Sequence, residues 1–172
     1  IAMEINLIKE PAEKVQVLSD LGSLYHNKLK LIQKAREAFQ MALDIDPKST
    51  VAIEAMADIL FSQEELAKAE PLFGRLSLLV DKDNADKLSN IYYKWGVIAE
   101  KLGRKDEAII RYSNALDIDE NNLDALQALG ELYYERAQWG FDKAQWQEAL
   151  DVYDRIYQHQ IGRASCRERV CH

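Results

Sequence analysis

Residues 117–121 (DIDEN) have the spacing of a metal-binding loop. In an EF-hand, oxygen ligands at alternating positions bind Ca²⁺, a glycine at position 6 makes the turn, and a glutamate at position 12 supplies two oxygens. Here Asn122 stands at the glycine position and Ala128 at the glutamate position. Residues 44–47 (DIDP) begin in the same way. We therefore interpret both runs as turns, and we expect no metal site.

Other chemically reactive residues are few and scattered. His26 and His159 lie far apart, neither belongs to an HExxH pattern, and the glycines form no GxGxxG or GxxxxGK phosphate loop. The third histidine, His172, and both cysteines, Cys166 and Cys171, fall in the segment 161–172. The rest of the chain therefore has no disulfide framework and no thiolate site. We expect a protein that is not an enzyme, with no catalytic residues and no cofactor.

The charge balance is acidic. The chain has 22 Lys and Arg residues against 29 Asp and Glu residues, a net charge of −7. An acidic surface repels phosphate backbones, so we expect no nucleic-acid partner. No apolar run reaches the length of a bilayer-spanning helix, so we expect no membrane insertion. Because Ile1 is not an initiating methionine, we expect the natural N-terminus to lie elsewhere; this leaves the location unassigned, with the cytoplasm favoured.

One pattern of large, small and aromatic residues recurs about every 34 residues, which is typical of stacked helical hairpins. The four copies are Leu21-Gly22, Tyr25, Ala35, Phe39, Ala42 and Pro47; Met56-Ala57, Leu60, Ala69, Phe73 and Leu76; Trp95-Gly96, Ala99, Ala108, Tyr112 and Ala115; and Leu129-Gly130, Tyr133, Ala149, Tyr153 and Ile156. In the first part of the fourth copy, Leu126, Leu129, Gly130 and Tyr133 follow the spacing i, i+3, i+4, i+7. In the second part of the first copy, Ala35, Phe39 and Ala42 follow i, i+4, i+7. Each copy therefore predicts two amphipathic helices.

Small residues recur at one position of each predicted helix. They are Gly22, Ala57, Gly96 and Gly130 in the first helices, and Ala35, Ala69, Ala108 and Ala149 in the second helices. A glycine inside a helix costs about 1 kcal/mol relative to alanine, so its recurrence requires a packing reason. We expect the two helices of a hairpin to approach closely where these small residues meet. The aromatic residues of the second helices should fill the space between successive hairpins: Phe39, Phe73, Tyr112 and Tyr153.

The pattern resembles the tetratricopeptide repeat family, whose repeats carry the same order of large apolar, small, Tyr or Leu, Ala, aromatic, small and Pro residues. The resemblance covers about residues 15–160. It implies an all-α fold, an α-solenoid of antiparallel helical hairpins with about four repeats. We expect the array at 14–160, preceded by the tail of another repeat at 1–13. The expected repeats are about 15–49, 50–88, 89–122 and 123–160.

Two spacings depart from the repeat period by five or more residues. The interval from Ala69 to Trp95 is 26 residues, five longer than the equivalent interval in the first copy, which predicts a longer linker. The fourth copy contains seven extra residues, because the triplet AQW at 137–139 returns at 144–146. Gly140 lies between the two triplets and predicts a loop instead of one longer helix.

The segment 161–172 has no repeat character. Residues 161–170 (IGRASCRERV) resemble a translated sequencing adapter, so we interpret 161–172 as a non-native tail and exclude it from the fold. The alternative is a native basic tail that binds nucleic acid or membrane. The last hairpin then lacks a following repeat. Its apolar face through Leu150 and Tyr153 should be partly exposed and should favour self-association.

The family resemblance also implies a partner-binding groove, which the first helices of such arrays line. The residues placed there are Glu54, Asp58, Phe61, Tyr93, Asp124, Gln127, Glu131 and Tyr134. A wider set adds Ser19, Ser23 and His26 from the first hairpin, and Asn90, Val97 and Lys101 from the third. Some family members bind acidic chaperone C-termini through Lys, Arg and Asn, whereas Glu54, Asp58 and Glu131 stand at such positions here. We therefore expect a protein or peptide partner with basic and apolar residues.

The resemblance favours a non-catalytic protein-interaction scaffold. Two alternatives use the same repeats: an arm of a larger enzyme, of the kinase or glycosyltransferase type, or a structural spacer in a longer solenoid. A further alternative is that the polar faces of the first helices are merely solvated and bind no ligand.

Overall fold

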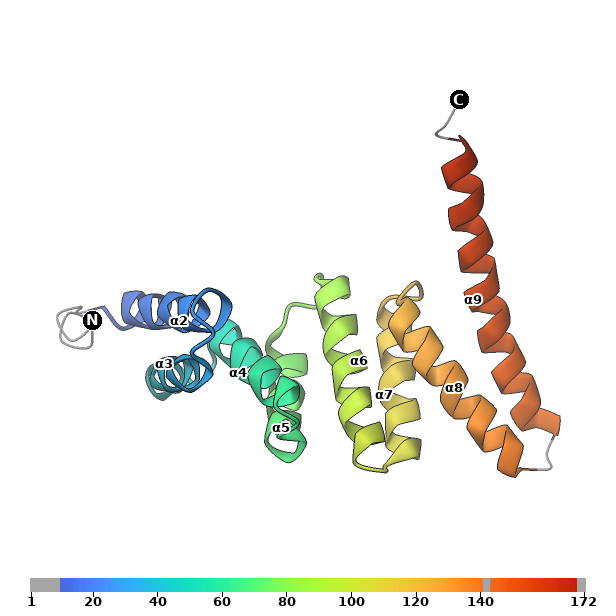
Figure 1. Cartoon of the computed structure of the whole chain (residues 1–172), viewed down its shortest axis with the longest axis horizontal. Coiled ribbons are helices and arrows are strands. Elements are labelled where there is room, and N and C mark those ends of the chain that lie inside the picture. The colour runs from blue at the N-terminus through green and yellow to red at the C-terminus, as the bar shows by residue number, and fades with distance from the viewer. Residues whose placement is uncertain (1–9, 141–142, 170–172) are drawn as a thin grey trace. The chain divides into compact units, whose positions relative to one another are not determined.

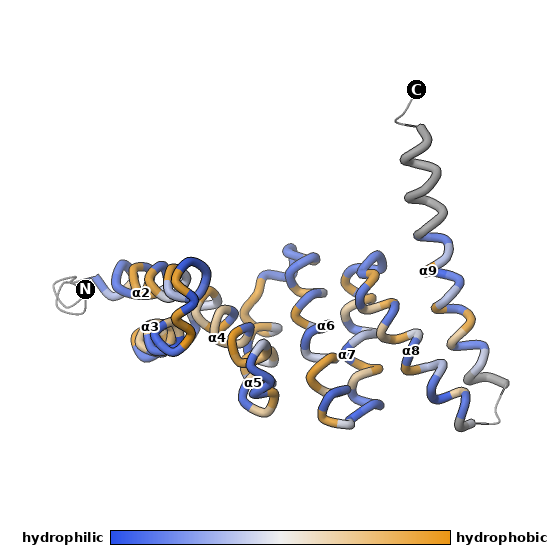
Figure 2. The backbone as a smooth tube through the Cα atoms, viewed as in Figure 1, coloured by the Kyte–Doolittle hydropathy of each residue, from blue (hydrophilic) through white to orange (hydrophobic). Residues whose placement is uncertain are grey.

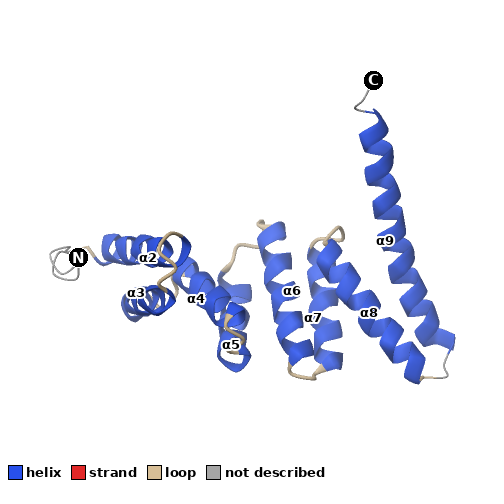
Figure 3. Cartoon of the chain, viewed as in Figure 1, coloured by secondary structure: helices blue, strands red, loops and turns tan. Residues whose placement is uncertain are grey.

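Helices and short turns make up the described part of the chain, residues 10–140 and 143–169 of the computed structural model (Figure 1). The helices are α2 (Pro11–Asn27), α3 (Ile32–Ile45), α4 (Thr50–Ser62), α5 (Leu66–Leu79), α6 (Ala85–Lys101), α7 (Lys105–Ile118), α8 (Leu123–Trp139) and α9 (Lys143–Arg169). These residues contain no strand, as Figure 3 shows. The predicted all-α class and the four helical hairpins are confirmed.

The chain divides into two compact units, residues 1–80 and 81–172. In the first unit, the hairpins α2–α3 and α4–α5 pack against each other through α3 and α4. In the second unit, the hairpins α6–α7 and α8–α9 pack through α7 and α8. Figure 2 shows apolar stretches alternating with hydrophilic ones along α6 and α7. This alternation follows from the helical period, because each of these helices buries one face.

The glycines of the first helices lie against aromatic rings. A Cβ atom at Gly22 would lie 2.7 Å from Cε1 and Cζ of Phe39, and one at Gly96 would lie 2.5 Å from Cδ1 and Cε1 of Tyr112. The prediction that the glycines meet the alanines of the second helices therefore named the wrong partner: the aromatic ring of the same hairpin occupies the space. Tyr112 also belongs to a buried cluster with Leu126 of α8, so this ring fills space between hairpins as well.

The turns between hairpins share one hydrogen-bonding pattern. The carboxylates of Asp46, Asp81 and Asp119 each accept a hydrogen bond from the backbone N–H two residues later, at 2.9, 3.1 and 3.0 Å. Aspartate favours turns because its side chain can bond the nearby backbone in this way. Asn84 and Asn122 then cap α6 and α8 by accepting a backbone N–H from the first turn of each helix. The run with calcium-loop spacing therefore ends in an ordinary inter-repeat turn.

A buried hydrogen-bonded chain fixes the start of α8 relative to α6 and α7. The side-chain amide of Asn122 donates to the hydroxyl of Ser89 at 2.8 Å, and that hydroxyl donates to the carbonyl of Ala115 at 2.9 Å. Ser89 is 1% exposed, so its bond to Ala115 lies away from water, while the bond from Asn122 is partly buried. A buried polar group that is fully bonded holds its neighbours in one arrangement. The bond from Asn122 thereby ties the start of α8 to α6.

Both departures from the repeat period lengthen first helices. Helix α6 begins ten residues before Trp95, whereas α8 begins six before Leu129, so four of the five extra residues form an added helical turn. The prediction of a longer linker is therefore wrong for four of the five extra residues. Helix α8 runs ten residues past Leu129, against six past Trp95 in α6, so four of its seven extra residues also form a turn. Gly140 then ends α8 with an extended backbone, which confirms the predicted loop.

The two ends of the described chain differ from expectation. Helix α2 begins at Pro11, inside the segment 1–13 that we assigned to a preceding repeat, and the proline occupies the start of the helix, where it is well tolerated. Helix α9 continues to Arg169, through most of the segment that we excluded as a tail. Nothing in the fold supports an adapter origin for that segment, so this interpretation stays a prediction.

Candidate functional site

The predicted groove residues lie on first helices of both units. Glu54, Asp58 and Phe61 lie on α4 in the first unit, and Tyr93 lies on α6 in the second unit. The others lie on α8: Asp124, Gln127, Glu131 and Tyr134. The site is therefore described one unit at a time.

In the second unit, α6, α7 and α8 bring aromatic rings and carboxylates together. The rings of Tyr93 and Tyr112 lie 5.9 Å apart between centroids, and the Tyr112 hydroxyl donates to Oε2 of Glu100 at 2.6 Å. On α8, the charge of Glu131 acts on both phenols, and the charge of Asp124 acts on Tyr93. We call these five residues the acidic–aromatic cluster.

Burial and the carboxylates of the cluster raise the pKa of its two phenols. Burial, and then the carboxylates of Asp124, Glu100 and Glu131, raise the pKa of Tyr93 above its usual value. Burial, followed by the hydrogen bond to Glu100, raises the pKa of Tyr112 still further. Each cause disfavours the negative charge that the phenol oxygen would carry after losing its proton. The three carboxylates place negative charge near Tyr93, which would attract a cation.

The cluster has an open side. Asp124 and Glu131 are exposed, and Tyr93 is half-buried. Gln127 lies between the two carboxylates on the same helix, and its amide donates to Oε1 of Glu131 at 3.0 Å. The prediction of Tyr93, Asp124, Gln127 and Glu131 as a group is therefore consistent with their placement, while their role in binding stays a prediction.

Sequence reasoning missed two members of the cluster. Glu100 follows Tyr93 by seven residues, as Glu131 follows Asp124, so each pair shares one face of its own helix. That spacing was a usable signal for Glu100. Tyr112 was assigned to packing alone, because nothing in the sequence shows that its hydroxyl reaches Glu100.

Tyr134 makes its ring contact with a residue outside the acidic–aromatic cluster. Its ring meets the ring of Trp146 on α9 edge-on, with centroids 5.8 Å apart and planes at 82°. Tyr134 is 45% exposed and Trp146 is 40% exposed, so the pair forms a separate aromatic surface on the last hairpin. In the first unit, Phe61 similarly meets Phe73 edge-on at 6.1 Å.

In the first unit, the predicted residues Glu54, Asp58 and Ser19 interact within the protein or are buried. Glu54 and Asp58 are half-buried, and both take part in interactions within the protein. Ser19, from the wider predicted set, is 2% exposed, and its hydroxyl donates to the carbonyl of Val15 at 2.8 Å. Placing Ser19 in a groove was therefore wrong, because a polar residue that bonds its own helix can be buried.

Helix α9 presents an exposed apolar face. Leu150 is 60% exposed and Tyr153 is 40% exposed, as predicted for a last hairpin. Trp146 and Tyr157 lie on the same face, at helical spacing from these two, and are 40% and 59% exposed. Large apolar side chains gathered in this way mark an interaction surface.

The described residues hold no group of three or more His, Cys, Asp or Glu side chains arranged to bind a metal ion. Within the same residues, no helix has the length and apolar character to cross a membrane.

The repeats also match known proteins. The family model described as "Tetratricopeptide repeat" matches residues 15–49 and 89–122, which are the limits that we expected for the first and third repeats. DnaJ homolog subfamily C member 7 from Homo sapiens is 30% identical over 82 residues, which are 48% of this chain and 15% of that protein. The chain therefore matches only a small part of this longer relative.

Two solved structures share the fold. The crystal structure of MamA matches with a TM-score of 0.71 at 24% identity, covering 88% of this chain and 81% of that chain. The first repeat domain of Spaghetti (RPAP3), bound to the HSP90 peptide SRMEEVD, matches with a TM-score of 0.62 at 23% identity, covering 73% of this chain and 94% of that chain. These likenesses concern the fold and not the partner.

Proposed function

Because the chain is a tetratricopeptide repeat protein, we propose that it is a non-catalytic scaffold that binds a partner segment on its first helices. The partner segment carries Lys or Arg beside an aromatic or aliphatic side chain. The acidic–aromatic cluster is the observation that carries this proposal. A repeat arm of a larger enzyme, or a spacer in a longer solenoid, remains an alternative that uses the same fold.

Two interactions support a basic partner. A cation near Asp124 and Glu131 gains Coulomb attraction from both carboxylates, and both are exposed to an incoming ligand. The half-buried ring of Tyr93 provides an aromatic contact, and a Lys or Arg over such a ring is stabilised by about 0.5–2 kcal/mol. An aliphatic or aromatic neighbour in the partner would pack beside the ring. The charges act mainly on the association rate, and the apolar contacts act on dissociation.

The Spaghetti (RPAP3) domain provides a contrast, since the peptide bound to it, SRMEEVD, is mainly acidic. Three carboxylates surround Tyr93 in the present chain. An acidic peptide there would meet like charges, which oppose binding. We therefore propose a partner of the opposite charge.

Fluorescence anisotropy with labelled peptides tests this choice. The probe is a capped peptide with the sequence Lys-Lys-Leu-Tyr-Lys-Lys, and its control has Ser in place of each Lys. We expect saturable binding of the Lys peptide, weaker at high salt because screening shortens the reach of the charges to about 8 Å at physiological ionic strength and less above it. Equal binding of the Ser peptide, or no saturable binding of the Lys peptide, would overturn the proposal.

We also propose self-association through the exposed apolar face of α9. Replacing Leu150 with glutamate places a charge in the middle of that face and should abolish a concentration-dependent rise in mass, measured by light scattering. Leu78→Glu is the matched control, because Leu78 is an exposed leucine on α5, at 86% exposure. A wild-type protein that stays monomeric at every concentration would disprove this proposal, as would an equal loss in both variants.

A further inference from the structure

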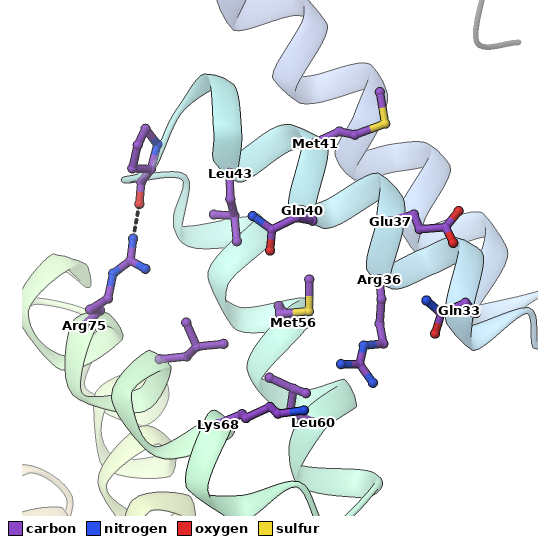
Figure 4. A pocket seen from close by; sticks show the side chains of 12 residues that line it. Gln33, Arg36, Glu37, Gln40, Met41, Leu43, Met56, Leu60, Lys68 and Arg75 are labelled. Atoms are coloured by element: carbon purple, nitrogen blue, oxygen red, sulfur yellow. Dashed lines mark hydrogen bonds between the residues drawn. The ribbon is translucent and has the colours of Figure 1, made fainter.

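A hollow of about 810 Å³ opens between α3, α4 and α5 in the first unit (Figure 4). Two of these helices, α3 and α5, are second helices, so the hollow differs from the surface proposed above. Its apolar lining comes from all three helices: Leu43, Met56, Leu60 and Leu72, with Met41 at 45% exposure. Methionine side chains adapt their shape to different partners. The hollow therefore offers an apolar side chain a deformable contact.

Three cations also line the hollow: Arg36, Lys68 and Arg75. Nη1 of Arg36 lies 2.5 Å from Oε1 of Glu65, and Nζ of Lys68 lies 2.6 Å from Oε2 of the same carboxylate. The bonds from Lys68 and Arg36 hold the pKa of Glu65 below its usual value. Arg75 instead donates to the carbonyl of Pro47, a neutral acceptor. The carboxylate of Glu65 thus pairs with two of the three cations, Arg36 and Lys68.

The lining of the hollow together with Glu65 carries one net positive charge. Glu37 is the carboxylate among the lining residues, so three cations face Glu37 and Glu65. This local excess occurs in a chain whose net charge is −7. Figure 4 shows Arg75 on one side of the hollow and Arg36 on the other, with Met56 between them. Positive charge therefore flanks an apolar centre on two sides.

We propose that this hollow binds an acidic peptide segment of a partner protein, with an apolar side chain in the centre and a carboxylate toward each cationic side. Lys68 and Arg75 lie two helical turns apart on α5, a rise of about 10 Å. An extended peptide covers that distance in about three residues. The expected ligand therefore carries one or two leucine-like residues between acidic ones. The chain would then hold two peptide surfaces of opposite charge preference.

Titration of the full chain with a labelled, doubly capped peptide, Glu-Glu-Leu-Leu-Glu-Glu, tests the proposal. We expect saturable binding, and we expect Lys68→Glu plus Arg75→Glu to weaken it by about fivefold or more, since each exposed charge pair contributes up to about 1 kcal/mol. Met41→Ser should weaken it about twofold to threefold, because it removes apolar contact without changing charge. If the double variant does not fold, Arg75→Gln provides the same test with a smaller change.

The control pair, Lys28→Glu plus Lys82→Glu, makes the same charge change at exposed residues that do not line the hollow. It should alter the affinity by less than about twofold, since surface charges at a distance are screened. Asp124→Lys plus Glu131→Lys should not weaken binding of this peptide, which separates the hollow from the acidic–aromatic cluster. Three results would each overturn the proposal: no saturable binding, equal loss in the control pair, or equal binding of a peptide with Ser in place of Leu.

Discussion

Replacing Gly96 with leucine is expected to lower the free energy of unfolding by about 1–3 kcal/mol. Even a Cβ atom at this position would lie 2.5 Å from two ring carbons of Tyr112, closer than such atoms can approach. The ring cannot move aside cheaply, because Tyr112 is 0% exposed and its hydroxyl is bonded to Glu100. Urea unfolding of the wild-type protein and the variant measures the difference.

Alanine at two glycines provides a matched comparison. Alanine favours a helix over glycine by about 1 kcal/mol, so a glycine with free space around it should tolerate the change or gain from it. Gly130 comes closer to that case, because a Cβ there would lie 3.3 Å from Cγ1 of Val152 and 3.5 Å from Cζ of Tyr153. We expect Gly96→Ala to destabilise the protein and Gly130→Ala to change its stability little. Unchanged unfolding of Gly96→Leu would show that Tyr112 does not require glycine.

Much of the fold was predictable from the sequence, because its repeats must bury a stripe of apolar residues at a fixed phase. Ala35, Ala69 and Ala108 are fully buried, as that phase predicts. The position of the extra residues was less predictable. A spacing counts residues without saying whether they extend a helix or a loop. Asn84 could have indicated this, because asparagine favours the N-cap position. A helix that begins just after Asn84 contains most of the five extra residues.

The site was predictable in part. The family resemblance placed Tyr93, Asp124 and Glu131 on first helices, and the hydrogen bonds of Ser89 and Asn122 tie the start of α8 to α6. The sequence could not show which ring a glycine meets, because that depends on the rotation of one helix against the other. The hollow beside α3 and α5 was also missed, since its lining comes from three helices with no shared motif.

The central claim is that the acidic–aromatic cluster binds a basic and apolar segment, and charge reversal there should have the largest effect on binding. The double variant Asp124→Lys plus Glu131→Lys replaces two attractive charges with two repulsive ones. We expect at least about a tenfold loss of affinity for the Lys-Lys-Leu-Tyr-Lys-Lys peptide, which corresponds to about 1.4 kcal/mol. The salt dependence of binding should fall with it, because fewer opposite charges remain to be screened.

Asp151→Lys plus Asp154→Lys supplies the matched control on α9. Both aspartates are exposed, and Asp151 accepts a hydrogen bond from Gln147 four residues earlier, as Glu131 does from Gln127. Anisotropy titrations of the wild-type protein and both double variants, at one ionic strength, give the most direct test. The proposal predicts a tenfold or greater loss for the cluster variant and less than about a threefold loss for the control. Equal losses in the two variants, or none in either, would contradict it.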